Sequence, residues 1–274
     1  MAISMCVLGS GSGGNCTLVS LDAGDRCRHV LIDAGLSPRR TTSLLAALGV
    51  SPGDISDVLL THLDTDHLHG GWINGRDRPR FTWRVHRRHE SRLIAAGVPV
   101  NRIEAFDGRF ELDPSTGVDT ALLPHDDLGS TGFVIEHGGA RLGFATDLGR
   151  ASPPLLTGFS RLDALAIESN YDLSLQMASP RPAFVKRRII GGLGHLSNEQ
   201  ALEAVLRIDR AGVLGHVVLL HLSRQCNEPR IIRRLWALQA PHLLGRLTLT
   251  SQDGPTSMLH VPAAPLESPV RVRP

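Results

Sequence analysis

The segment from Thr61 to Gly70 carries an unusual density of side chains that can bind a metal ion. Five of its residues, within a span of eight, are histidine or aspartate, and the apolar run Val58-Leu59-Leu60 precedes them. Such a run predicts a buried strand, so the segment is expected to be the loop that leaves it. Burying these side chains without partners is costly, whereas a bound cation compensates for the cost. The spacing therefore predicts a metal-binding loop with the candidates His62, Asp64, Asp66 and His67, whereas His69 on the same loop is interpreted as a residue of the pocket rim.

Other candidate ligands follow apolar runs elsewhere in the chain, where strands are expected to end. Side chains at strand ends can meet although they are distant in sequence. A hydrolytic metal site requires imidazoles and carboxylates with one coordination position left for water, and two neighbouring metals also require a bridging group. The residues at or just after expected strand ends supply enough groups for such a two-metal site: Asp33, His62, His125, Asp147, Glu168 and His221.

These motifs together resemble the metallo-β-lactamase superfamily. The loop is similar to the superfamily signature His-x-His-x-Asp-His, and His125, Asp147 and His221 follow in the order of its later ligand motifs. The resemblance covers residues 1 to about 250 and implies an α/β fold, the αββα sandwich, in a single domain. Six narrower motifs resemble the YycJ/WalJ-type branch, regarded as a nuclease-like phosphodiesterase group, and they lie at 8–15, 31–35, 146–149, 168–171, 194–198 and 221–223.

The resemblance implies a site for two divalent metal ions, zinc or manganese. All of the implied ligands are nitrogen or oxygen donors, and Asp33 is interpreted as a structural carboxylate near them. The implied ligands are His62, Asp64 and His125 for the first ion, Asp66, His67 and His221 for the second, and Asp147 as the bridge between them.

One residue departs from the superfamily signature, because position 64 is aspartate where the signature has histidine. A carboxylate still binds metal ions, but it is a harder ligand than imidazole and carries a negative charge. It shifts the preference from zinc toward manganese or another ion that favours oxygen. The competing interpretation is that Asp64 binds weakly or not at all and that the protein is a metal-depleted binding module.

The resemblance also implies hydrolysis by metal-activated water at neutral pH. Asp66 is implied to orient this water, and His195 to act at the leaving oxygen while Glu168 holds its imidazole. The segment 195–198 is similar to the His-Ser-Thr loop of ribonuclease Z, which favours a phosphodiesterase or nuclease. The alternatives are a thioesterase or lactonase on the same fold. His195 can equally be a helix-cap or packing residue, and Glu168 a structural carboxylate.

A basic cluster lies shortly before His195. Its residues are compatible with a solvated helix face or with contacts to the phosphates of a nucleic acid, which would make binding salt-sensitive. Only 4% of the residues are aromatic, so a surface for base stacking is poorly supplied. The cluster consists of Arg181, Lys186, Arg187 and Arg188.

The pair His86 and His89 has the spacing of a metal-binding motif but is interpreted as part of a charged helix start. Arginines at positions 87 and 88 separate the two histidines and would repel a cation. This pair is therefore left outside the predicted metal site.

Strands alternate with helices early in the chain, which is typical of α/β folds. Ser37-Pro38 predicts the start of a helix through Leu48, and Ser197 with Gln200 predicts a capping box for a helix through Ala211. Further helices are expected at 88–96, 181–189 and 228–239. Strands are expected at 3–8, 16–21, 29–33, 54–60, 81–86, 102–113, 118–124, 132–136, 140–146, 163–167, 217–220, 246–250 and 257–261.

The 274-residue chain has the composition of a folded protein, with 42% hydrophobic residues and a net charge of +2. No segment resembles an interdomain linker, so residues 1–261 are expected to form one hydrolase domain and residues 262–274 a loose tail. No apolar run reaches the roughly 18 residues of a membrane span, and no signal peptide is recognised. The four cysteines form no CxxC pair and are expected to be reduced. We therefore expect a cytoplasmic protein without a membrane partner, whose substrate is a phosphodiester, with nucleic acid as a candidate.

Overall fold

Apolar strands build two β-sheets, and the computed structural model describes them within residues 1–75, 80–210 and 214–262. Each sheet has seven strands, and the last described strand joins the sheet formed by the N-terminal strands. In spatial order, the first sheet contains β14 (Leu259–Val261), β1 (Ala2–Gly9), β2 (Cys16–Asp22), β3 (Cys27–Ile32), β4 (Ile55–Leu60), β5 (Thr82–His86) and β6 (Ile103–Phe106).

The second sheet is built from the following part of the chain. Its strands β10 to β13 run parallel, whereas its remaining strand pairs are antiparallel. In spatial order it contains β13 (Leu247–Leu249), β12 (His216–Leu220), β11 (Ala164–Glu168), β10 (Ala140–Ala145), β9 (Ser130–His137), β8 (Thr116–Leu123) and β7 (Phe110–Asp113).

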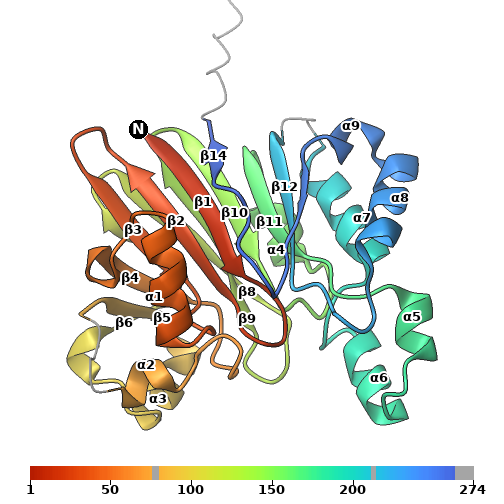
Figure 1. The fold of residues 1–274 in the computed structure, drawn as a ribbon, viewed down its shortest axis with the longest axis horizontal. Helices are drawn as coiled ribbons and strands as arrows, with labels where there is room; N and C mark the ends of the chain where they lie inside the picture. The colour runs from red at the N-terminus through yellow and green to blue at the C-terminus, as the bar shows by residue number, and fades with distance from the viewer. Residues whose placement is uncertain (76–79, 211–213, 263–274) are drawn as a thin grey trace, which may run out of the picture.

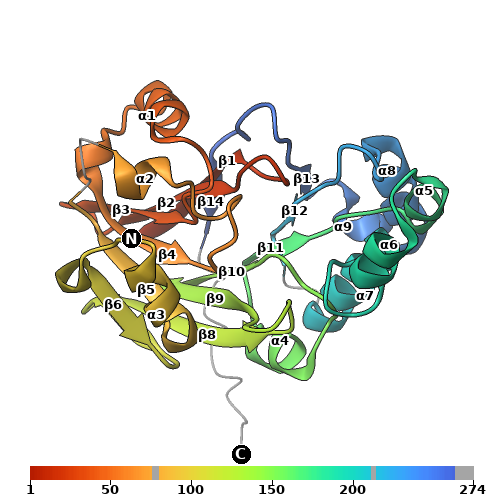
Figure 2. The ribbon, with the colours of Figure 1, turned by 90° about the horizontal axis from the view of Figure 1, so that it is seen from below.

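Strands that are apolar on both faces explain the layering of the molecule. In β12, Val218 and Leu220 pack into the core between the two sheets, whereas Val217 and Leu219 pack against helices on the outer face. Successive strand residues point to opposite faces, so a continuous apolar run produces a sheet that is covered on both sides. Figure 1 and Figure 2 show the resulting order of layers, helix, sheet, sheet, helix, which confirms the predicted αββα sandwich.

Helices cover the outer faces of both sheets. Apolar residues of α1 (Pro38–Ala47), α2 (Gly71–Asn74) and α3 (Arg87–Ala95) share one core with the first sheet. Those of α4 (Pro153–Gly158), α7 (Asn198–Ile208), α8 (Pro229–Gln239) and α9 (Pro241–Leu244) share another core with the second sheet. Two further helices, α5 (Leu173–Ala178) and α6 (Ala183–Ile190), stand side by side at the lower right of Figure 1. Short 3₁₀ turns occupy Pro52–Asp54 and Val100–Arg102.

The capping motifs predicted from the sequence are confirmed. The side chain of Ser37 accepts the N–H of Arg40 at the start of α1, and Ser197 and Gln200 form the reciprocal bonds of a capping box at the start of α7. The helix predicted to continue through Ala211 ends at Ile208, and residue 211 lies outside the described residues.

The prediction of one strand over 102–113 was wrong. The segment forms β6 in the first sheet and β7 in the second, with Gly108 at a positive φ of 139° between them. The chain leaves one sheet here and enters the other, which an apolar pattern alone does not reveal. No sequence pattern indicated the short helices α2, α4, α5 and α9. Apart from Pro262, the expected tail lies outside the described residues.

Within the described part of the chain, no helix is long and apolar enough to cross a membrane.

An ion-pair triad joins three neighbouring strands below the predicted metal-binding loop. The carboxylate of Asp57 on β4 lies 2.6 Å from Arg28 on β3 and 2.6 Å from Arg84 on β5, and its side chain is only 1% exposed. Burial raises the pKa of Asp57, but hydrogen bonds from Ser56 and both arginines outweigh burial and lower the pKa below its usual value. The triad therefore stabilises the folded protein while Asp57 is ionised.

Replacing Asp57 by asparagine should reduce the free energy of unfolding at pH 7 by about 2–3 kcal/mol, because two arginines lose a buried counter-charge. The pKa of Asp57 is lower in the folded protein than in the unfolded chain. The contribution of Asp57 to the free energy of unfolding is therefore complete above about pH 4. It is lost as the pH falls through the pKa that Asp57 has in the folded protein. Urea unfolding of both proteins from pH 7 to pH 3 measures the difference. Asp119→Asn, which breaks an exposed pair with Arg109, is the control and should leave the free energy of unfolding nearly unchanged. Equal losses in the two variants would contradict this account.

Candidate metal centre

The loop between β4 and α2 is fixed by backbone contacts to two neighbouring segments. The N–H of Ala34, just after β3, donates to His67 O. The N–H of Asn15, in the glycine turn after β1, donates to Asp66 O. At Gly35 a Cβ atom would lie 1.7 Å from Asp66 O, so a side chain at this position would clash with the loop. The first sheet thus holds the loop that carries four of the predicted ligands.

Three residues that follow strands adopt the left-handed backbone conformation. They are Asp33 after β3, Asp147 after β10 and His221 after β12, with φ values of 61°, 53° and 55°. Residues other than glycine rarely occupy this region, and such strain, of order 1–3 kcal/mol per residue, is concentrated at functional sites. The side chains of all three residues contact one another or the same histidine, His67. The strand ends of both sheets therefore converge as the sequence predicts.

A first cluster is formed by His62, Asp64 and His125, whose candidate ligand atoms lie within 4.8 Å of one another. His62 Nε2 is 3.8 Å from Asp64 Oδ2. His125 donates its Nδ1–H to Gly194 O over 3.0 Å, which leaves Nε2 as its free lone pair. Both imidazoles are buried, whereas the Asp64 side chain is 57% exposed. The residue that departs from the family signature thus lies on the solvent side of this cluster.

A second cluster is formed by Asp66, His67 and His221. Asp66 Oδ2 lies 3.3 Å from His221 Nε2 and 3.7 Å from His67 Nε2. On the other side of its ring, His67 Nδ1 contacts Asp33 Oδ2 at 2.7 Å, which orients the imidazole with Nε2 toward the cluster. Asp33, interpreted from the sequence as structural, therefore supports a candidate ligand directly.

Asp147 lies between the two clusters and is almost fully buried. Its carboxylate oxygens are 3.0 Å from His67 Nε2, 3.8 Å from His221 Nε2 and 4.0 Å from His125 Nε2. Burial raises the pKa of Asp147, but the surrounding imidazoles, His221 and His67 foremost, outweigh burial and hold the pKa well below its usual value. An ionised carboxylate that reaches histidines of both clusters has the position required of a bridging ligand.

One buried atom supports metal binding independently of the family resemblance. His62 Nε2 has no hydrogen-bond partner among the described residues. Burial, followed by the nearby charge of His67, lowers the pKa of His62 well below its usual value, so the ring is neutral. Its Nδ1 lies 3.0 Å from the Thr61 hydroxyl, which leaves Nε2 as the ligand atom. A neutral imidazole with a free buried nitrogen is the form that binds divalent cations, so the residues present fit such ions.

Beside the second cluster, the buried Glu168 pairs with His195, whose side chain is 21% exposed. His195 Nδ1 is 2.7 Å from Glu168 Oε1 and 3.5 Å from Asp147 Oδ1. The other oxygen of Glu168 accepts the N–H groups of Leu148 and Leu196, so the carboxylate is held from three directions. Burial lowers the pKa of His195, but the charge of Glu168 outweighs burial and raises it. The structure thus brings together the two residues that the sequence pairs.

The family follows from comparison with known proteins. A family model described as the Metallo-beta-lactamase superfamily matches residues 9–209, which include every predicted site residue except His221. The chain belongs to the metallo-β-lactamase superfamily. Superfamily membership places the protein among metallo-hydrolases. The described residues that could hold a divalent metal ion are those of the two clusters, Asp147, and the pair Glu168 and His195 beside them.

Two bacterial relatives within the superfamily match most of the chain. Exodeoxyribonuclease YycJ of Bacillus anthracis is 27% identical over 240 residues, which cover 85% of this chain and 87% of the relative. Exodeoxyribonuclease WalJ of Streptococcus pneumoniae is 28% identical over 232 residues, which cover 81% and 82%. These matches confirm the resemblance to the YycJ/WalJ-type branch.

Solved structures share the fold at lower identity. Zn²⁺-bound PqqB from Methylobacterium extorquens aligns with a TM-score of 0.65 and 19% identity over 92% of this chain and 99% of its own. A long form of RNase Z from yeast aligns with a TM-score of 0.57 and 16% identity over 83% of this chain and 38% of its own. The similarity to ribonuclease Z noted in the sequence is therefore present in the fold.

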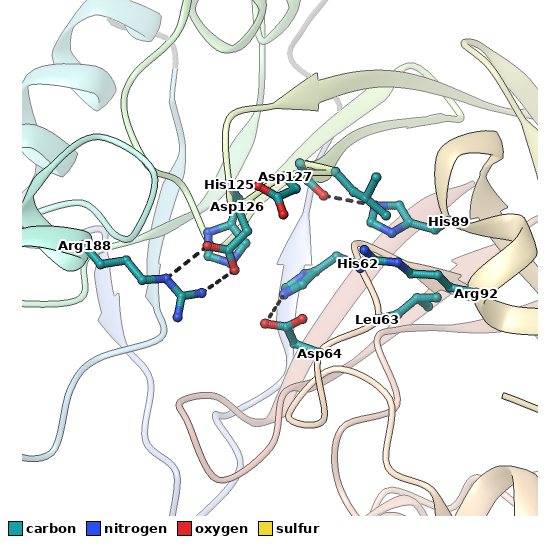
Figure 3. A pocket seen from close by; sticks show the side chains of 11 residues that line it. His62, Leu63, Asp64, His89, Arg92, His125, Asp126, Asp127 and Arg188 are labelled. Carbon is teal, nitrogen blue, oxygen red and sulfur yellow. Dashed lines mark hydrogen bonds and ion pairs between the residues drawn. The ribbon is translucent and has the colours of Figure 1, made fainter. Parts of the chain in front are cut away.

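A cavity of about 340 Å³ adjoins the first cluster. Figure 3 shows the side chains that line it. His62, Asp64 and His125 line one part of it. The remaining lining includes residues that sequence reasoning did not assign to the site, because they come from α3, from α6 and from the loop after β8: His89, Arg92, Asp126, Asp127 and Arg188.

The pair His86 and His89 serves the start of α3, as interpreted from the sequence. His86 Nδ1 accepts the N–H of Arg88 as the helix cap, and neither histidine belongs to a possible metal cluster among the described residues. His89 nevertheless lines the cavity, and its Nε2–H donates to Gly129 O at the end of the loop that carries His125.

Two asparagines near the ligands were not assigned a role from the sequence. Asn170 donates to His221 O over 2.7 Å, and its amide nitrogen lies 3.0 Å from His221 Nδ1. The amide nitrogen of Asn15 lies 3.0 Å from His67 Nε2. Both residues occur in motifs recognised above, at 168–171 and 8–15, and that occurrence was the signal that could have identified them.

Replacing Asp64 by alanine should remove about one of two bound divalent ions per chain, because only the first cluster loses a donor. Metal content of purified protein, supplemented with manganese or zinc and then desalted, measures this. His69→Ala is the matched control, because His69 lies on the same loop but in no possible metal cluster of the described residues. Two ions retained by Asp64→Ala would show that Asp64 is not required as a ligand, and less than one ion in the unmodified protein would contradict the two-metal site.

Proposed function

We propose that the protein is a metal-dependent phosphodiesterase that cleaves DNA as a nuclease. The observation that carries the proposal is the hydrogen-bonded pair Glu168 and His195, which lies beside a buried set of ligands for two divalent ions. The names of two relatives, both exodeoxyribonucleases, support the same substrate class. All four cysteines are free. This agrees with the cytoplasmic location that we expect for a protein acting on the DNA of a cell.

The proposed metal ligands are those of the two clusters with Asp147 between them. When bound, the two ions would supply Lewis acidity and lower the pKa of water to about 7. Asp64 adds an oxygen donor to the first cluster. Compared with a site made only of imidazoles, this cluster has a stronger preference for manganese. Zinc or manganese therefore both suit the donor set.

His195 is proposed as the general acid. Its Nδ1 is occupied by Glu168, so its Nε2 is the nitrogen left to hold a proton for the substrate. The charge of Glu168 raises the pKa of His195 despite burial, which favours the protonated imidazole that a general acid requires. A DNA alkoxide is a strongly basic leaving group and needs the proton. A thiolate, with a pKa near 8.5, needs it far less. The pair therefore favours phosphodiester cleavage over thioester cleavage.

Asp66 is proposed to orient the attacking water. Its side chain is 20% exposed, more than any other member of the second cluster, so water can reach it. Burial raises the pKa of Asp66, but a hydrogen bond from His221 and the charge of His67 outweigh burial and lower it. The carboxylate is therefore ionised at neutral pH and accepts a hydrogen bond from water.

His195→Ala should lower the turnover of a DNA oligonucleotide by roughly 10²- to 10⁴-fold, with metal content unchanged. The loss should be much smaller for bis(p-nitrophenyl) phosphate, because its phenolate leaving group is weakly basic. Steady-state rates on both substrates and metal analysis of the same samples measure these effects, with His69→Ala as the control. A parallel loss of metal and turnover, or an equal loss on both substrates, would contradict the acid role.

A substrate screen separates this function from the alternatives on the same fold. Cleavage of phosphodiesters with inert thioesters and lactones is expected. Turnover of thioesters or lactones with inert phosphodiesters would instead identify a thioesterase or lactonase.

A further inference from the structure

Residues 173–193 form an arm that consists of helices α5 and α6 and the turn after them. This arm does not pack into the apolar cores of the protein. No described residue of α6 is buried, and in α5 only Gln176 is buried. None of the residues of this arm belongs to the three apolar cores described for the protein. Both views show the two helices side by side at one edge of the sandwich (Figure 1, Figure 2).

The α5–α6 arm exposes large apolar side chains to solvent. Leu173, Met177, Phe184 and Leu193 are 47%, 58%, 67% and 50% exposed. They are half of the eight exposed large apolar residues in the described part of the chain. A concentration of this kind on a soluble surface marks a binding surface. Phe184 is also the one aromatic side chain exposed among the described residues, which contain all 11 phenylalanine, tryptophan and tyrosine residues.

The charge of the α5–α6 arm has one sign. Residues 173–193 contain four basic side chains and no aspartate or glutamate. Arg181, Lys186 and Arg187 form no ion pair with any described residue, and Lys186 Nζ contacts the carbonyl of Met177. The arm therefore presents unneutralised positive charge next to exposed apolar groups.

The arm reaches the candidate metal centre directly. Arg188 lines the cavity that also contains His62 and Asp64, and its guanidinium is 2.6 Å from Asp126, the neighbour of His125 (Figure 3). Below α6, Leu193 O accepts the N–H of Asp126, and Gly194 O accepts from His125. A polymer bound along the arm would thus lead to the site.

We propose that the α5–α6 arm binds single-stranded DNA and directs it to the metal centre, an inference that rests on the proposed nuclease function. Arg181, Lys186 and Arg187 contact phosphates, and Phe184 stacks on a base. Positive charge along a backbone path combined with an aromatic platform is the recognition mode of proteins that bind single strands. A duplex keeps its bases stacked internally and offers Phe184 no base face, so single strands are favoured. The scarcity of aromatic residues limits the stacking to one position.

Kinetics with two substrates test the proposal. Phe184→Ala should raise KM for a single-stranded oligonucleotide about tenfold with kcat nearly unchanged, because a stacked base is lost. Arg187→Gln should raise KM several-fold and reduce the slope of log KM against log salt by about 0.7, the value for one phosphate contact on a single strand.

Both variants should cleave bis(p-nitrophenyl) phosphate like the unmodified protein, because that substrate is too small to reach the arm. The controls are Leu238→Ala and Arg234→Gln on α8, which are also exposed.

The outcomes separate this inference from the proposed function. If the unmodified protein cleaves neither phosphodiester, the nuclease function fails. If it cleaves both and the arm variants match the α8 controls in KM and salt slope, the function stands and the arm proposal is overturned. A dimer in sedimentation velocity that Phe184→Ala dissociates, or binding to phosphatidylglycerol vesicles that replaces DNA binding, would assign the arm to a second copy or a lipid surface and also overturn it.

Discussion

The buried carboxylate of Asp147 is the interaction on which the rest of the site depends. Four imidazoles lie within 4.0 Å of it, those of His67, His125, His195 and His221. A carboxylate is not stable in such a buried place without compensating positive charge or hydrogen bonds. The imidazoles supply this compensation and keep Asp147 ionised, and they in turn depend on its charge. The cluster is therefore one coupled unit, and the sandwich must deliver its parts to one point.

The fold meets this requirement through its strand ends and through supporting residues behind the ligands. The left-handed backbone conformations of Asp33, Asp147 and His221 are unfavourable in themselves. The packing of the strands that precede these residues offsets this cost. Asp33 holds His67, and Glu168 holds His195. These carboxylates fix which ring nitrogen faces the site, and that determines which nitrogens can bind a metal or hold a proton. The proposed metal ligands and the proposed catalytic residues thus share one rigid support, whereas the α5–α6 arm lies outside it.

Much of this arrangement could be predicted from the sequence, because ligand-type residues after apolar runs are a local signal. The convergence of His62, His67, His125, Asp147 and His221 was expected from it, whereas the αββα fold class was implied by the resemblance to the metallo-β-lactamase superfamily. The crossing between sheets within 102–113 could not be predicted, since both halves have the same strand pattern. The cavity residues His89 and Arg92 on α3 and Asp126 in the loop after β8 belong to no recognised motif, and only the packing of these two elements brings them together. The exposure of Phe184 likewise depends on tertiary structure, because a large apolar residue on an amphipathic helix is ordinarily expected to face a core.

Anomalous diffraction from crystals grown with manganese or zinc tests the central claim most directly. The account predicts two metal peaks, one bound by His62, Asp64 and His125 and the other by Asp66, His67 and His221, with Asp147 shared by both. A single peak, or peaks that do not contact Asp147, would contradict a two-metal centre organised around this carboxylate.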